Sequence, residues 1–170
     1  LDALVMIAYL FSVILLPLFS KMLKDREDLS PIIKTSFSLL FFFSVTSVIL
    51  LILYRIPILS FLYHEHIYES SAVFQILIPC LIPISFTYIF GTLLTANGNM
   101  KLLNISAIAG ILVNMIVNLI LIPKFHAVGA AVASLSTQSI VAMLQIVIVF
   151  KSLKLPLKNI PYRSCLLFIV

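Results

Sequence analysis

The sequence predicts an all-α protein, a polytopic bundle of transmembrane helices with about five complete spans and a truncated sixth. Hydrophobic residues make up 62% of the 170 residues, whereas soluble domains average about 45–50%. Charged residues make up only 10%, against about 25% in soluble domains. Charge-free runs of about 20 residues recur along the chain, and this is the length that a helix needs to cross about 30 Å of hydrocarbon.

The same composition argues against several other classes of protein. This chain is too small to bury so much apolar surface in one core and remain soluble. The composition therefore argues against a water-soluble enzyme, a nucleic-acid-binding domain, a disulfide scaffold and a disordered chain. The net charge of +5 does not indicate nucleic acid, because the 11 Lys and Arg residues stand at the ends of apolar runs. Cys80 and Cys165 lie within apolar stretches and are interpreted as small buried residues.

Six segments are expected to lie in the membrane, and together they are expected to form a single transmembrane lobe over residues 1–170. We expect this lobe to be a piece of a longer protein, because the last segment is too short to span a bilayer. Pro79 and Pro83 should bend the third segment, since proline removes a helical hydrogen bond. The segments are residues 3–20, 35–54, 72–95, 102–122, 127–150 and, truncated, 160–170.

The cations predict how these spans are oriented. With six spans the connections alternate between two sides, and nine Lys and Arg residues fall on one side. The other side carries only Arg55 and Lys124. The side rich in cations is normally cytoplasmic, so loops 21–34, 96–101 and 151–163 are expected in the cytoplasm. The chain then begins on the outer side of the cytoplasmic membrane.

Ionisable groups at membrane depth are the first candidates for a transport site. Asp2 is the one acid of this kind, at the start of the first span. It could face a watery cavity and bind a proton or a cation, or it could be an interfacial residue near a helix end. Arg55 is a cation at an outer helix end and a second candidate.

The fourth and fifth spans carry amides and small residues at steps of three and four, which places them on one face of each helix. In the fourth span they are Asn104, Ala107, Gly110, Asn114 and Asn118, and in the fifth span they are Ala131, Ser134, Gln138, Ala142 and Gln145.

Two interpretations of this pattern remain open. The first, which we favour, is close packing of the two helices, involving Gly110, Gly129, Ala131, Ser134 and Gln138. The second is a polar cavity, lined by the amides of Asn104, Asn114 and Asn118.

The sequence contains no pattern typical of an enzyme. It has no glycine-rich phosphate loop, no Ser-His-Asp grouping and no paired carboxylates within a span. We therefore expect no enzymatic activity, no cofactor and no metal site.

Five stretches, taken in order, resemble the polysaccharide transporter (oligosaccharide flippase) family of the multidrug/oligosaccharidyl-lipid/polysaccharide exporter superfamily. Residues 121–134, which read LIPKFHAVGAAVAS, are the most specific of them, and the chain has His126 where the family usually has glycine. The other stretches are residues 1–3, 16–24, 62–65 and 90–99.

The resemblance implies a protein of two six-helix lobes, of which this chain would be the second. It implies that the full-length protein flips a polyprenyl-linked oligosaccharide across the cytoplasmic membrane by alternating access, for surface polysaccharide biosynthesis. The partners would be the lipid bilayer, this substrate and the N-terminal lobe of the same protein, and no nucleic acid. A cation-coupled multidrug exporter of the same superfamily, a non-transporting membrane scaffold and an intramembrane enzyme remain as alternatives.

Overall fold

The structure, a computed structural model, describes residues 2–62 and 67–153. Within these ranges it is built from helices and contains no strand, which confirms the predicted all-α bundle. Residues 160–170, expected as a truncated sixth span, lie outside the described residues, as does most of the expected loop at 151–163. Four described segments are long and apolar enough to cross a membrane: Asp2–Asp25, Ser30–Leu53, Ser70–Ala96 and Met100–Leu153.

Helices α1 (Asp2–Asp25) and α2 (Ser30–Leu53) form the first pair of spans. Each has 24 residues, or about 36 Å of helix, which exceeds the hydrocarbon thickness of about 30 Å. In the short turn between them, Asp28 Oδ1 accepts the backbone N–H of Ser30 at 2.9 Å. Hydrogen bonds from the Ser30 side chain and backbone lower the pKa of the Asp28 carboxyl, so this exposed acid helps to begin α2.

A short helix, α3 (Arg55–Leu62), follows α2 directly. The chain bends at Tyr54, whose backbone N–H still donates to the Leu50 carbonyl at 3.0 Å. Ile58 then donates to the Tyr54 carbonyl at 3.0 Å. These two hydrogen bonds stand on either side of the bend, and α3 packs against the next helix in the chain.

The third span is broken in the middle. It consists of α4 (Ile67–Leu77), one 3-10 turn, η1 (Ile78–Cys80), and α5 (Leu81–Ala96). Pro79 lies within η1 and Pro83 in the first turn of α5. Neither residue has a backbone N–H to donate. The α-helix is therefore interrupted by the tighter 3-10 turn at the position where the two prolines were expected to bend it.

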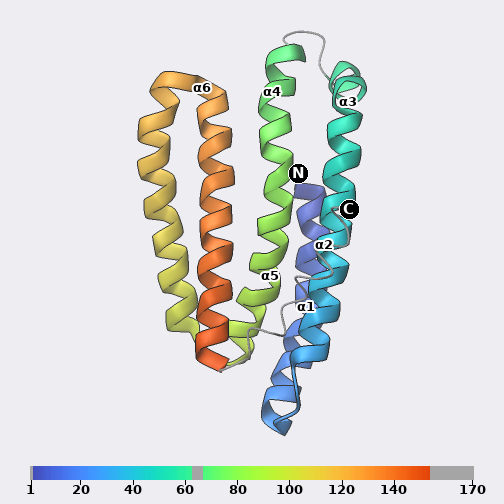
Figure 1. The fold of residues 1–170 in the computed structure, drawn as a ribbon, viewed down its shortest axis with the longest axis vertical. Coiled ribbons are helices and arrows are strands. Elements are labelled where there is room, and N and C mark those ends of the chain that lie inside the picture. Colours follow the sequence, from blue (N-terminus) through green and yellow to red (C-terminus); the bar gives the residue numbers. More distant parts are fainter. Residues whose placement is uncertain (1, 63–66, 154–170) are drawn as a thin grey trace.

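The last element, α6 (Met100–Leu153), has 54 residues and would be about 81 Å long if it were straight. It reverses at His126, whose φ of 50° and ψ of −127° are not helical. The two arms, residues 100–125 and 127–153, lie side by side as an antiparallel hairpin (Figure 1). The segments expected at 102–122 and 127–150 fall within these two arms.

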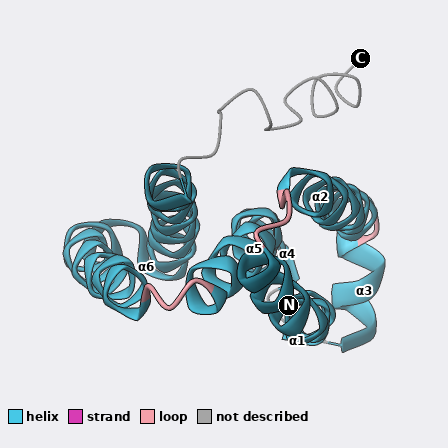
Figure 2. Ribbon diagram, turned by 90° about the horizontal axis from the view of Figure 1, so that it is seen from below, coloured by secondary structure: helices cyan, strands magenta, loops and turns pink. Residues whose placement is uncertain are grey.

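Helix α5 occupies the centre of the bundle. It packs against α1 and α2 on one side and α6 on the other (Figure 2). Its fully buried Ile89 and Leu93 meet Phe19 of α1 and Val149 of α6 in one apolar cluster. The hairpin of α6 stands at the edge of the bundle, and much of its first arm is exposed.

Candidate functional site

A chain of side-chain hydrogen bonds joins the two arms of α6. Asn114 Nδ2 in the first arm donates to Thr137 Oγ1 in the second at 3.2 Å. Asn118 Nδ2, one turn along, donates to Asn114 Oδ1 at 2.8 Å. Two of the predicted amides are thus brought together, but their partner in the second arm is Thr137, which the sequence analysis did not single out. The third amide, Asn104, is exposed and takes no part.

Glycines allow the two arms to approach closely. A Cβ on Gly110 would lie 2.5 Å from Val141 Cγ2, and a Cβ on Gly129 would meet the backbone of Leu121. Ala131 is buried, whereas Ser134 and Gln138 are half-buried. This geometry is the one expected for close packing of two membrane helices through small residues.

An open groove of about 530 Å³ runs along the hairpin between the two arms. Its polar groups are the side chains of Asn114, Thr137 and Gln138. Ile111, Met115 and Val141 form apolar walls, and Ala107 and Gly110 contribute little bulk. Of the three amides expected to line a polar cavity, only Asn114 lines this groove. Asn118 lies outside this groove and lines a smaller one of about 290 Å³.

A second polar contact joins the two arms of α6 and lies beside α5. Gln145, only 3% exposed, donates through Nε2 to Ser106 Oγ at 3.4 Å. Its Oε1 is buried with no hydrogen-bond partner within residues 2–62 and 67–153, and it lies 3.4 Å from the position of a Cβ on Gly91. Gln145 lies on the face of the fifth span that the sequence predicted to be polar, but nothing in the sequence indicated Gly91 as its neighbour.

A third polar contact joins α2 to α5. The hydroxyls of Ser44 and Ser85 lie 2.7 Å apart, and Ser85 Oγ also lies 2.8 Å from the Leu81 carbonyl. Ser85 therefore donates to Leu81 and accepts from Ser44. Both serines are buried, so the bond is made within the apolar core.

The two candidate charged residues lie apart from these contacts. Asp2 is exposed in the first turn of α1. Arg55 begins α3 and is half-buried, and its Nε is buried with no hydrogen-bond partner among the described residues. No hydrogen bond or ion pair in the described ranges joins either residue to the amides of α6. Those ranges also contain no group of three residues that could hold a metal ion.

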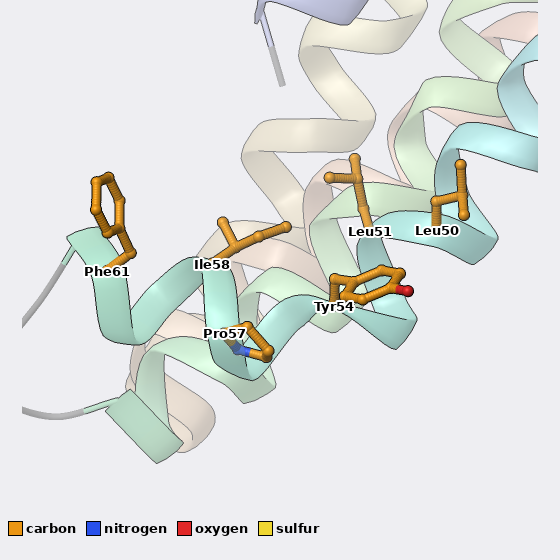
Figure 3. Close-up of a pocket in the computed structure, with 6 residues that line it drawn as sticks. All are labelled: Leu50, Leu51, Tyr54, Pro57, Ile58 and Phe61. Atoms are coloured by element: carbon orange, nitrogen blue, oxygen red, sulfur yellow. The ribbon is translucent and has the colours of Figure 1, made fainter.

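A groove of about 510 Å³ lies at the bend between α2 and α3, just beside Arg55 in the sequence. Figure 3 shows the six side chains that line it. They are apolar apart from the hydroxyl of Tyr54, in contrast to the mixed lining of the α6 groove. A groove of carbon atoms at the end of a span is suited to contact with lipid chains rather than to selection of a polar ligand. The lining residues are Leu50, Leu51, Tyr54, Pro57, Ile58 and Phe61.

The described cations are distributed unequally between the two ends of the bundle. Helices α1 and α2 meet at the same end as α5 and α6, and α6 also finishes there (Figure 1). Six cations lie in or next to those junctions: Lys21, Lys24, Arg26, Lys34, Lys101 and Lys151. The opposite end carries Arg55 and Lys124.

The long apolar helices and their antiparallel packing are those of an integral membrane protein with several spans. A model of the Lipid II flippase MurJ family matches residues 3–169, and the chain belongs to this family. The family consists of flippases, which are transporters of the inner membrane and not enzymes, and it lies within the superfamily that the sequence signatures predicted. Searches of curated proteins and of solved structures found no match.

The structure gives a physical reason why glycine would suit position 126, where the signature of the polysaccharide transporter family has it. His126 is the residue that reverses α6, and its φ is positive. Glycine adopts such a conformation without steric cost, whereas a residue with a Cβ does not. His126 therefore keeps the hairpin turn at the expense of local strain.

Proposed function

We propose that the full-length protein flips a lipid-linked saccharide precursor across the cytoplasmic membrane by alternating access. The match of the flippase family to residues 3–169 carries this proposal. The physical problem is that a sugar-pyrophosphate headgroup would lose its water in hydrocarbon with nothing in return. A two-lobe transporter solves it by offering a hydrated cleft to the headgroup while the lipid tail stays in the bilayer.

The family name supports a substrate of the lipid II kind, a precursor of the cell wall. An oligosaccharide for surface polysaccharide is the second candidate, which the resemblance to the polysaccharide transporter family implies. Both substrates join a lipid tail to a sugar headgroup, so the same cycle serves either.

In this proposal residues 1–170 act as one transmembrane lobe, and the N-terminal lobe of the same protein completes the cleft. The unequal distribution of the cations supports cytoplasmic placement of loops 21–34, 96–101 and 151–163. At the outer end this lobe offers Arg55 and Lys124. Cations that meet the pyrophosphate deeper in the membrane would then belong to the other lobe.

A flipping assay tests the proposal. The full-length protein is reconstituted into vesicles with a fluorescent lipid-linked saccharide, and the fraction of substrate that reaches the outer leaflet is measured over time. We expect faster equilibration than in protein-free vesicles and no effect on an ordinary fluorescent phospholipid. Equal rates with and without protein would contradict a flippase and favour a scaffold. Export of a cationic dye without movement of the saccharide would favour the multidrug exporter.

A further inference from the structure

The mixed groove of α6 has the size of a site for a small polar ligand. Its volume of about 530 Å³ falls within the range of about 300–1,000 Å³ that small-molecule sites occupy. Ile111 in its wall is 67% exposed. The groove is therefore not covered by the other described helices.

The lining of the groove matches a sugar ring. The amides of Asn114 and Gln138 can each donate and accept hydrogen bonds, as can the hydroxyl of Thr137. Ile111 and Val141 offer apolar surface beside them, which suits the C–H faces of a ring. No charged side chain from the described part of the chain lines the groove. An uncharged ligand rich in hydroxyls fits this lining, whereas a pyrophosphate finds no cation there.

The groove also contains a side-chain amide, that of Gln138, which does not take part in holding the hairpin together. The arms are held together by the bond from Asn114 to Thr137 and by the contact of Gly110 with Val141. The amide of Gln138 is half-buried and makes no hydrogen bond among the described residues. An amide left facing hydrocarbon is unfavourable, because lipid offers it no partner. A lipid chain would leave it unpaired, and a hydroxyl-bearing ligand would not.

We propose that this groove binds the saccharide headgroup of the lipid-linked substrate, with Gln138 as its main contact. The inference rests on the proposed function and adds a binding site to it. The two parts of the headgroup would then bind at different places: the sugar at the neutral amides of this lobe, and the pyrophosphate elsewhere in the protein.

Photo-crosslinking identifies what occupies the groove. The full-length protein carries p-benzoylphenylalanine in place of Gln138, in membranes that contain a lipid-linked precursor with a radiolabelled sugar. Illumination should attach the label to the protein, and an excess of unlabelled precursor should remove the signal. The same probe in place of Met143, a residue 67% exposed on the same arm, should attach no labelled sugar. Crosslinks from position 138 only to phospholipid, or only to another helix of the protein, would overturn the proposal.

A pair of variants tests the contribution of the amide. Gln138→Leu should weaken the apparent affinity for the precursor about tenfold, the effect of losing one hydrogen bond worth about 1.4 kcal/mol, without lowering the melting temperature. Ser139→Ala is the matched control, because Ser139 Oγ donates to the Leu135 carbonyl of its own helix at 2.8 Å. If Gln138→Leu left the affinity unchanged while the wild type flipped the precursor normally, the groove would be rejected as a binding site and the proposed function would stand. Absence of flipping by the wild type would reject the proposed function.

Discussion

Gly129 lies against the backbone of Leu121 where the two arms of α6 meet. A Cβ on Gly129 would stand 2.7 Å from the Leu121 carbonyl carbon, closer than real Cβ contacts occur. The atoms in the way belong to the backbone, so no side-chain rotation can relieve the contact. The hairpin can close at this point because residue 129 has no side chain.

Gly129→Ala should therefore lower the stability of the protein by about 1–3 kcal/mol, the usual effect of overpacking, and Gly129→Leu should reduce the amount of folded protein in the membrane. The melting temperature of the full-length protein in detergent measures the first effect. Ala127→Leu, at an exposed position of the same turn, is the control and should change little. A wild-type melting temperature for Gly129→Ala would show that the arms can separate without loss.

His126→Gly should raise stability by about 1 kcal/mol, because glycine removes the strain of a positive φ with a ψ of −127°. Thermal unfolding measures the gain. His126→Ala keeps the Cβ and should give no such gain, which separates backbone strain from any effect of the imidazole. If the two variants gave equal increases, relief of strain would not be the cause.

Ser44 and Ser85 should be energetically coupled, because their hydroxyls bond to each other inside the bundle. In a double-mutant cycle with alanine we expect a coupling energy of about 0.6 kcal/mol and at most about 1.7 kcal/mol, as for other hydrogen bonds between membrane helices. Ser20→Ala is a suitable control, since Ser20 is exposed and bonds to the Leu16 carbonyl of its own helix. Additive effects of the two alanine substitutions would show that α2 and α5 do not depend on this bond.

Single cysteines test the orientation in the membrane. In a background without Cys80 and Cys165, Lys24→Cys and Lys151→Cys should react with an impermeant thiol reagent only from the cytoplasmic side. Lys124→Cys should react only from outside, because the reversal of α6 lies at the opposite end of the bundle. Labelling of Lys124→Cys from the cytoplasm would contradict the orientation.

Asp2→Asn should leave flipping near the wild-type rate at equal protein levels. Asp2 is exposed in the first turn of α1, and the described residues contain no group that could hold a metal ion with it. The alternative, a residue that carries a proton or cation in each cycle, predicts loss of flipping with folding intact, because the amide keeps the shape and loses the titration. The reconstituted flipping assay distinguishes the two.

The membrane-spanning segments could be predicted because a span is a local property. About 20 consecutive apolar residues are needed wherever the helix packs, so a charge-free run such as 35–54 points to α2 without knowledge of its neighbours. An interruption of the α-helix at Pro79, found as a 3-10 turn, was predictable for a similar reason, because the missing N–H belongs to that residue itself. The amide stripe on the first arm of α6 follows from helical periodicity alone.

Tertiary structure decided which of these residues meet. Thr137 rather than Gln138 bonds to Asn114, and this choice depends on how far each arm is rotated about its own axis. Ser44 and Ser85 are 41 residues apart in the chain. Their pairing depends on how α2 and α5 pack, and α3 and α4 separate these two helices in the sequence. Hydrogen bonds are short and directional, so a rotation or shift that leaves the apolar pattern unchanged still exchanges one partner for another. The sequence by itself thus determined which segments form helices long and apolar enough to cross a membrane, whereas only the packed structure determined the polar contacts and the groove.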